Sequence, residues 1–354
     1  MGTGCDPVLE RMRVRVGSEV RTVRFVDEAQ LREALRHTLA GEPVITWPRL
    51  HLEDLEAVDA LLAQNRLEPA DAADRRYLCR VHEEAVFFVE EVLGQPLAPQ
   101  LRRPRDPRTL FLLASGRRGR RRADACMVLK VMNVVHHLNA RELRMRLPLS
   151  DGDLAFAADT LAYDALTKVQ RAGVRVLRFE GGVKARQSLL LKLMTPGYHM
   201  ADQVPDRVRY RIVVERREDI VPAVKGLMGT LLPFNTLVPG QLRNDLVPLE
   251  EALTAPSATA RRAEAPAPAN PFSGPDFRVL SFVADLPIRC IDFFDAPPSA
   301  LEAFGPVLFA TVEMQIVDAA TAEANESGRA SHAAYKARQK AAVLARLVPG
   351  DESG

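Results

Sequence analysis

After Gly173 the chain alternates short β-branched runs with amphipathic helical segments, and this alternation limits the folds open to it. Strand-like runs lie at Val174–Phe179 and Arg207–Val214, and helical periodicity follows each of them. Strands that alternate with helices indicate a layered α/β or α+β domain. The same periodicities predict helices at Ala185–Met194, Glu218–Leu232 and Ala319–Leu347, and further strands at Phe277–Val283 and Phe309–Val317.

The first half of the chain has a helical pattern, after a short strand or hairpin predicted at Arg11–Val26. Leu31, Leu35 and Leu39 recur at helical spacing. Because 354 residues exceed the usual size of a single domain, we expect a mostly helical accessory domain at 1–150 and a mixed domain at 151–348. Further helices are predicted at Leu52–Leu61, Tyr77–Leu93, Met127–Leu147 and Asp151–Arg171.

The Ala/Pro-rich segment at 254–275 interrupts the second half. Its composition buries too little apolar surface to fold, so the sequence predicts a disordered insert within the mixed domain.

Composition excludes several classes of protein. The charges of the 48 basic and 46 acidic residues nearly cancel, so a polyanion would have to bind at a local basic patch. No apolar run is long enough to span a membrane, and Met1–Val14 lacks the apolar core of a signal peptide. The four cysteines form no C-x-x-C pair, which is typical of reduced thiols. We therefore expect a cytoplasmic protein without a membrane partner.

One local patch is strongly basic. Between Arg102 and Arg122 arginines follow one another closely, and clustered guanidinium groups bind phosphates well. The stretch predicts a contact with RNA, and the alternative interpretation is a solvated loop and helix start.

A histidine pair stands at His136 and His137 in the helical half. A metal-dependent hydrolase would need further His and Asp ligands at set distances, and the sequence around the pair supplies none. We therefore expect His136 to be a core residue.

Two strands carry polar residues on one face. In Arg207–Val214, Arg207, Arg209 and Arg211 alternate with apolar residues, so they need phosphates or nearby carboxylates between them. In the last strand Glu313 and Gln315 share one face. A carboxylate and an amide at this spacing can jointly hold a metal ion and a hydroxyl group.

The segment from this last strand onward resembles the end of the synthetase domain of the RelA/SpoT family, which makes guanosine tetra- and pentaphosphate. That family has E-x-Q-I-R-T and then A-E-x-G-x-A-x-H-x-x-Y-K at the same offsets. The residues in register are Glu313, Gln315, Ile316, Glu326, Gly328, Ala330, His332, Tyr335 and Lys336.

Looser matches to the same family precede the Glu313–Lys336 segment in the expected order. The resemblance therefore covers about residues 173–347. They are Val183–Ser188 with Lys192, Asp206–Ile212, Val238–Asp245 and Asp276–Ser281.

The resemblance implies an α+β fold, in which the helical N-terminal half is followed by a nucleotidyltransferase-like mixed β-sheet flanked by helices. It implies transfer of pyrophosphate from ATP to the 3′-hydroxyl of a guanine nucleotide or RNA end. Asp206 and Glu313 would be catalytic and would hold Mg²⁺. The implied nucleotide-binding residues are Lys184, Ser188, Lys192, Arg211, Phe277, Arg278, Gln315 and His332.

Several positions depart from the family pattern. Gly182 replaces an arginine that packs on adenine, Ser281 replaces a histidine near the acceptor, and Val317 and Asp318 replace the R-T after E-x-Q-I. These losses favour an alternative hypothesis, a catalytically inactive nucleotide- or RNA-binding module on the same fold. A third hypothesis is an interaction scaffold without a ligand.

Overall fold

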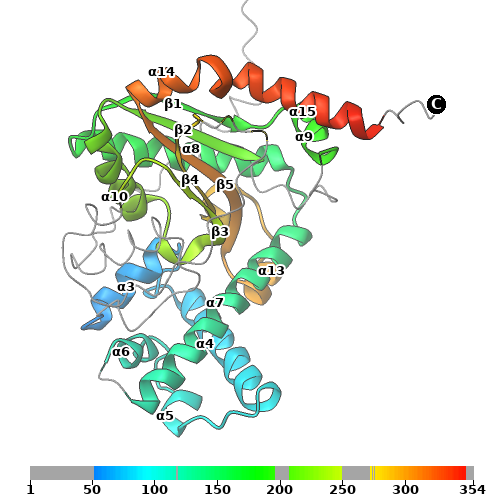
Figure 1. Cartoon of the computed structure of the whole chain (residues 1–354). Helices are drawn as coiled ribbons and strands as arrows, with labels where there is room; N and C mark the ends of the chain where they lie inside the picture. The colour runs from blue at the N-terminus through cyan, green and yellow to red at the C-terminus, as the bar shows by residue number, and fades with distance from the viewer. Residues whose placement is uncertain are drawn as a thin grey trace, which may run out of the picture. The chain divides into compact units, whose positions relative to one another are not determined.

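The computed structural model describes residues 52–116, 119–195, 207–248, 272, 274 and 276–347 (Figure 1). The hairpin predicted at Arg11–Val26, the predicted helix around Leu31 and the catalytic candidate Asp206 all lie outside these residues. So does the insert predicted at 254–275, apart from Phe272 and Gly274.

By its packing the chain divides into two compact units. Within the described residues, the first unit contains Leu52–Leu149 and Pro287–Phe309, and the second contains Ser150–Leu286 and the chain from Ala310 onward. The mostly helical accessory domain expected at 1–150 and the mixed domain expected at 151–348 stay a prediction.

The first unit is a helical assembly. Its helix α3 (Leu55–Gln64) begins after Asp54, whose Oδ1 accepts a hydrogen bond from the backbone N–H of Ala57 at 2.8 Å. Apolar faces at helical spacing then bury against one another, and α4 and α6 pack on the long helix α7. The other helices of this unit are α4 (Ala72–Phe87), continued by one π-helical turn, α5 (Pro99–Arg102), α6 (Thr109–Ser115), α7 (Arg120–Arg146), α12 (Cys290–Phe293) and α13 (Pro298–Phe304).

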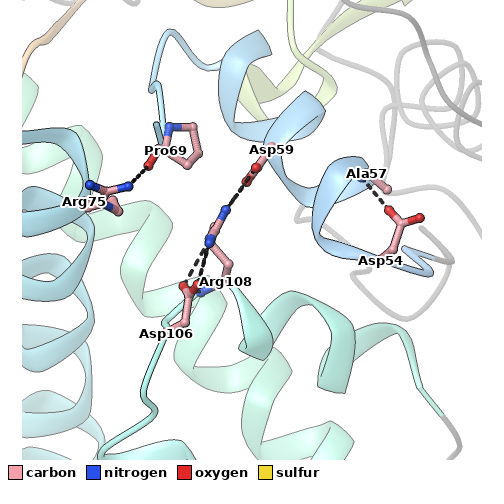
Figure 2. Close-up of polar contacts among 7 residues, drawn as sticks. All are labelled: Asp54, Ala57, Asp59, Pro69, Arg75, Asp106 and Arg108. Carbon is pink, nitrogen blue, oxygen red and sulfur yellow. Dashed lines mark hydrogen bonds and ion pairs between the residues drawn. The ribbon is translucent and has the colours of Figure 1, made fainter. Parts of the chain in front are cut away.

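Arg108 ties two parts of this unit together, as Figure 2 shows. Its Nη2 lies 2.6 Å from Asp106 Oδ2, and its Nη1 lies 2.8 Å from Asp59 Oδ1 on α3. Arg102 is likewise paired with Glu90 at 2.6 Å, and Arg120 with Asp124 at 3.8 Å. Part of the predicted RNA-binding stretch therefore forms ion pairs within the protein.

The second unit is built on a five-stranded sheet in the order β1-β2-β5-β4-β3. β1 and β2 are antiparallel, β2 and β5 are parallel, and β3 and β4 are antiparallel. Helices flank the sheet (Figure 1), so the predicted α+β class with a mixed sheet is confirmed. The strands are β1 (Val176–Val183), β2 (Val208–Val214), β3 (Leu237–Asn244), β4 (Leu280–Arg289) and β5 (Val307–Asp318).

One face of this sheet is apolar and buried. Tyr210 and Ile212 of β2 alternate with polar residues and are at most 1% exposed. The Tyr210 hydroxyl donates to Asp159 Oδ1 at 2.6 Å, which links the strand to α8 (Asp151–Arg171). Gly181 of β1 is required here, because a Cβ atom at that position would lie 2.4 Å from the Tyr210 ring. Helix α10 (Ile220–Thr230) packs against α8.

The helix predicted at Ala319–Leu347 is interrupted. The structure has α14 (Ala319–Asn325), a 3₁₀ turn at Gly328–Ala330 and α15 (His332–Leu347). Gly328 adopts a φ of +55°, a left-handed conformation that stops a helix. The prediction of one continuous helix was therefore wrong.

Strand β3 was not predicted from the sequence. Its centre holds Pro239 and Gly240, which are poor strand formers, and its pairing with β4 is irregular between Leu237 and Leu242. Among the described residues, no helix combines the length and apolarity needed to cross a membrane.

Candidate active site

The second face of the sheet is polar, and β2 and β5 together provide its centre. In the parallel register Arg209 pairs with Glu313, and Arg211 pairs with Gln315. Alternation places these four side chains on the same face, opposite the buried Tyr210.

Glu313 lies in a fixed hydrogen-bond arrangement on this face. Its Oε1 accepts a hydrogen bond from Ser281 Oγ of the neighbouring strand β4 at 3.0 Å and another from Gln315 Nε2 at 2.8 Å. The side chain is half-buried. One carboxylate oxygen is thereby bound on two sides, which orients the whole group.

Arg211 supplies positive charge beside this carboxylate. Its Nη1 is paired with Glu326 Oε1 at 2.9 Å, so the carboxylate that meets this arginine comes from the turn after α14. Its Nη2 is buried and has no hydrogen-bond partner among the described residues. A buried N–H group without a partner is costly, and an anionic ligand on this face would satisfy it.

Helices α9 (Arg186–Leu193) and α15 bring further cations. Lys336 Nζ donates to Ser188 Oγ at 3.1 Å, which links the two helices. Lys192 is only 9% exposed. Desolvation lowers the pKa of His332, and the positive charges of Lys336, Arg209 and Arg211 lower it further. The negative charge of Glu326 acts in the opposite direction and raises the pKa of His332.

Phe277 lies just before β4, where contacts from Arg243 and Asn325 hold the chain. The Arg243 guanidinium lies 5.3 Å from the centre of its ring, and Arg243 Nη2 donates to the Phe277 carbonyl at 2.8 Å. Asn325 clamps the next residue, Arg278, through hydrogen bonds to its backbone N–H and carbonyl. One face of the Phe277 ring is therefore covered by a cation.

Some of the predicted site residues are in direct contact with one another in the structure. Glu313 and Gln315 are hydrogen-bonded to each other, and Ser188 contacts Lys336 of the other family-like motif. Lys184 extends the β1–β2 pairing through its backbone N–H, which donates to the Arg207 carbonyl at 2.7 Å. Asp206 is outside the described residues, so its convergence with Glu313 stays a prediction.

Sequence reasoning missed the polar partners that arrive from elsewhere in the chain. Ser281 was treated only as a lost histidine, although it contacts Glu313. Its place one strand away from Glu313 could have been found only from the strand order. The other missed residues are Arg243, Asn325 and, as the partner of Arg211, Glu326.

The described residues hold no group of three or more His, Cys, Asp or Glu side chains arranged for a metal ion. Glu313 nevertheless fits Mg²⁺, because this ion is commonly held by one or two carboxylates together with substrate phosphates. The hard oxygen donors and the surrounding cations are both suited to a metal–phosphate ligand.

The histidine pair of the first unit belongs to a core instead. His136 is 8% exposed, its Nδ1 lies 2.8 Å from the Tyr77 hydroxyl, and its ring meets Phe309 edge-on. The prediction of a core histidine is confirmed.

No protein-family model matches the sequence, and no curated protein matches it. Among solved structures the chain is similar to small alarmone synthetase 2 from Bacillus subtilis, with 16% identity and a TM-score of 0.30, over 54% of this chain and 87% of that chain. It is similar to small alarmone synthetase 1 from the same organism with 16% identity and a TM-score of 0.29, over the same 54% and 87%. A structure of that synthetase bound to its product pppGpp matches over 52% of this chain and 80% of that one, with 16% identity and a TM-score of 0.29.

Proposed function

We propose that the second unit is a divergent RelA/SpoT-like pyrophosphate transferase, which moves pyrophosphate from ATP to the 3′-hydroxyl of a guanine nucleotide or RNA end. The observation that carries the proposal is the oriented carboxylate of Glu313 on a sheet face that also carries Arg209 and Arg211. Its position in the family-like E-x-Q-I motif supports the same function.

Transfer of a phosphoryl group depends mainly on positioning and on neutralising charge. The triphosphate of ATP would lie along the cationic face, where Arg211 and Lys192 bind its oxygens. The unpaired Nη2 of Arg211 supports this role, since a phosphate oxygen would give that group its missing acceptor.

Glu313 would act as the general base. A carboxylate within hydrogen-bond reach of the 3′-hydroxyl accepts its proton as the oxygen attacks the β-phosphate of ATP. The two hydrogen bonds to Oε1 hold the carboxylate in place, and Oε2 is the oxygen available to the acceptor. AMP then leaves.

Phe277 would stack on the guanine base of the acceptor. A phenyl ring offers the flat face that stacking requires. Because Arg243 covers one face of the ring, the base would take the opposite face.

Mg²⁺ would be held by Glu313 and Asp206 together with the phosphates, and it would neutralise the charge that develops on the phosphate oxygens. A cytoplasmic location, where ATP and guanine nucleotides are present, is part of the proposal.

The test is incubation of the full chain with Mg²⁺, radiolabelled ATP and GDP, GTP or RNA as acceptor. We expect a pyrophosphorylated product, and we expect Glu313→Gln to lower kcat by about 10²- to 10⁴-fold. Glu323→Gln, on the exposed surface of α14, is the matched control and should retain activity. The absence of product with every acceptor, or equal activity in the two variants, would contradict the proposal.

The second candidate is an inactive nucleotide-binding module on the same fold, and Gly182 favours it. Its φ of +146° is disfavoured for any residue with a side chain. The adenine-packing arginine of the family therefore could not be restored here without a change of backbone. This candidate predicts measurable binding of ATP or GTP with no turnover.

If the inactive module binds RNA, it would do so through exposed arginines of the Arg102–Arg122 stretch. Arg103, Arg105, Arg120 and Arg121 are exposed. Replacing all four by alanine should reduce RNA affinity and its salt dependence. Unchanged binding of a labelled single-stranded RNA would exclude RNA binding through these arginines.

A further inference from the structure

A side chain from the neighbouring strand contacts the carboxylate of Glu313. Ser281 of β4 donates its hydroxyl hydrogen bond to Oε1 of Glu313 at 3.0 Å. We infer that Ser281 is a positioning residue, which holds the carboxylate so that its second oxygen points to the acceptor hydroxyl. This inference rests on the proposed function, because it assigns a role within the same site.

The need for such a residue follows from the length of the glutamate side chain. Glutamate has several rotatable bonds, and an unrestrained carboxylate would spread over many positions. Gln315 binds the same oxygen at 2.8 Å, but it belongs to the same strand and moves with Glu313. Within the part of the chain that the structure describes, the contact from β4 is the hydrogen bond that fixes the carboxylate relative to a second strand.

The environment of Ser281 supports this role. It is half-buried, between Leu280 and Phe282, which are buried on the opposite face. Alternation along β4 therefore directs its hydroxyl to the polar face. The small hydroxyl side chain at this position reaches the carboxylate of Glu313 directly.

The same two strands contain a matched control. Thr311 of β5 donates its hydroxyl to Asp285 Oδ1 of β4 at 2.7 Å. This contact has the same chemistry and also joins β4 to β5, but it does not involve Glu313. Thr311→Ala thus removes a cross-strand hydroxyl–carboxylate hydrogen bond without disturbing the proposed base.

The experiment compares Ser281→Ala, Ser281→Thr and Thr311→Ala in the full chain. A misplaced catalytic group costs about 10²-fold in rate, so we expect Ser281→Ala to lower kcat by about 10- to 100-fold while the KM for ATP changes by less than about 2-fold. Ser281→Thr keeps the hydroxyl and should recover most of kcat. Equal kcat values for Ser281→Ala and Thr311→Ala, or no recovery in Ser281→Thr, would overturn the inference.

A second measurement separates this inference from the proposed function. With ¹³C-labelled glutamate, the carboxyl resonance of Glu313 can be identified by its loss in Glu313→Gln. We expect Ser281→Ala to shift this resonance and Thr311→Ala to leave it in place. If the wild-type chain makes no product but the resonance shifts, the positioning contact stands and the transferase proposal fails. A resonance that does not move overturns the positioning role whether or not product forms.

Discussion

Asn325 holds the backbone of Arg278 at both of its polar atoms. Its Oδ1 accepts a hydrogen bond from the Arg278 N–H at 3.1 Å, and its Nδ2 donates to the Arg278 carbonyl at 2.7 Å. The side chain is 3% exposed and comes from the last residue of α14. The clamp therefore joins the start of the family-like helical motif to the segment that carries Phe277.

Removal of this clamp should destabilise the protein. Asn325→Ala removes the Asn325 side chain from two part-buried hydrogen bonds to the backbone of Arg278, and a polar group left unsatisfied on burial costs about 1–3 kcal/mol. We expect the free energy of unfolding to fall by about 2–4 kcal/mol, measured by urea denaturation. The control is Ser327→Ala, which removes an exposed hydrogen bond to Ala324 nearby. Similar stability of the two variants would show that the clamp contributes little.

The stacking of Arg243 on Phe277 predicts a separate effect on acceptor binding. A guanidinium over an aromatic ring contributes about 0.5–2 kcal/mol. Arg243→Lys keeps the charge but loses the flat stacking surface. We therefore expect the Kd for GDP or GTP to rise roughly 2- to 30-fold, with ATP affinity unchanged, in a fluorescence titration.

The matched control for Arg243 is Arg216→Lys. Arg216 is an exposed arginine paired with Glu218, and its replacement should leave both affinities as in the wild type. An equal loss of ATP and guanine nucleotide affinity in Arg243→Lys would mean that Arg243 does not act through Phe277.

The first unit contains a buried ion pair whose disruption should be severe. Asp74 and Arg289 approach to 2.6 Å, with side chains 4% and 11% exposed. Asp74→Asn leaves the buried charge of Arg289 uncompensated, which typically costs about 3–5 kcal/mol. The exposed pair of Glu142 and Arg146 provides the comparison, because Glu142→Gln should change stability by no more than about 0.5 kcal/mol. Urea denaturation of both variants distinguishes the two cases.

Burial, together with a smaller effect of the nearby His137, lowers the pKa of His136 to about 3. In the unfolded chain the pKa of a histidine is about 6.5. Between these values the unfolded state binds a proton that the folded state does not bind. Stability from this group is therefore complete above pH ~6.5 and falls as the pH falls toward 3, by about 1.4 kcal/mol per pH unit.

Replacing His136 with asparagine should flatten this pH dependence. Asparagine keeps a polar group near Tyr77 but does not titrate. We expect the fall in Tm between pH 7 and pH 5 to be smaller in His136→Asn than in the wild type, measured by circular dichroism. The same fall in both proteins would mean that other groups dominate the acid sensitivity.

Local patterns were enough to predict most elements of the second unit. The helix predicted at Asp151–Arg171 has the same bounds in the structure, and the strand predicted at Arg207–Val214 begins one residue later. Period-two alternation also predicted that Glu313 and Gln315 share a face, and their hydrogen bond agrees with it. The break in the last helix was missed because it depends on the backbone conformation of Gly328.

The sequence by itself determined which residues alternate along each strand and helix, because periodicity depends only on neighbours along the chain. Only the tertiary structure decided that Ser281 would meet Glu313, 32 residues away, and that Glu326 would meet Arg211. Such contacts depend on the order of the strands and on where a helix returns to the sheet. The strand order and the helix position depend on the burial of apolar faces that are far apart in sequence, so no local pattern predicts them.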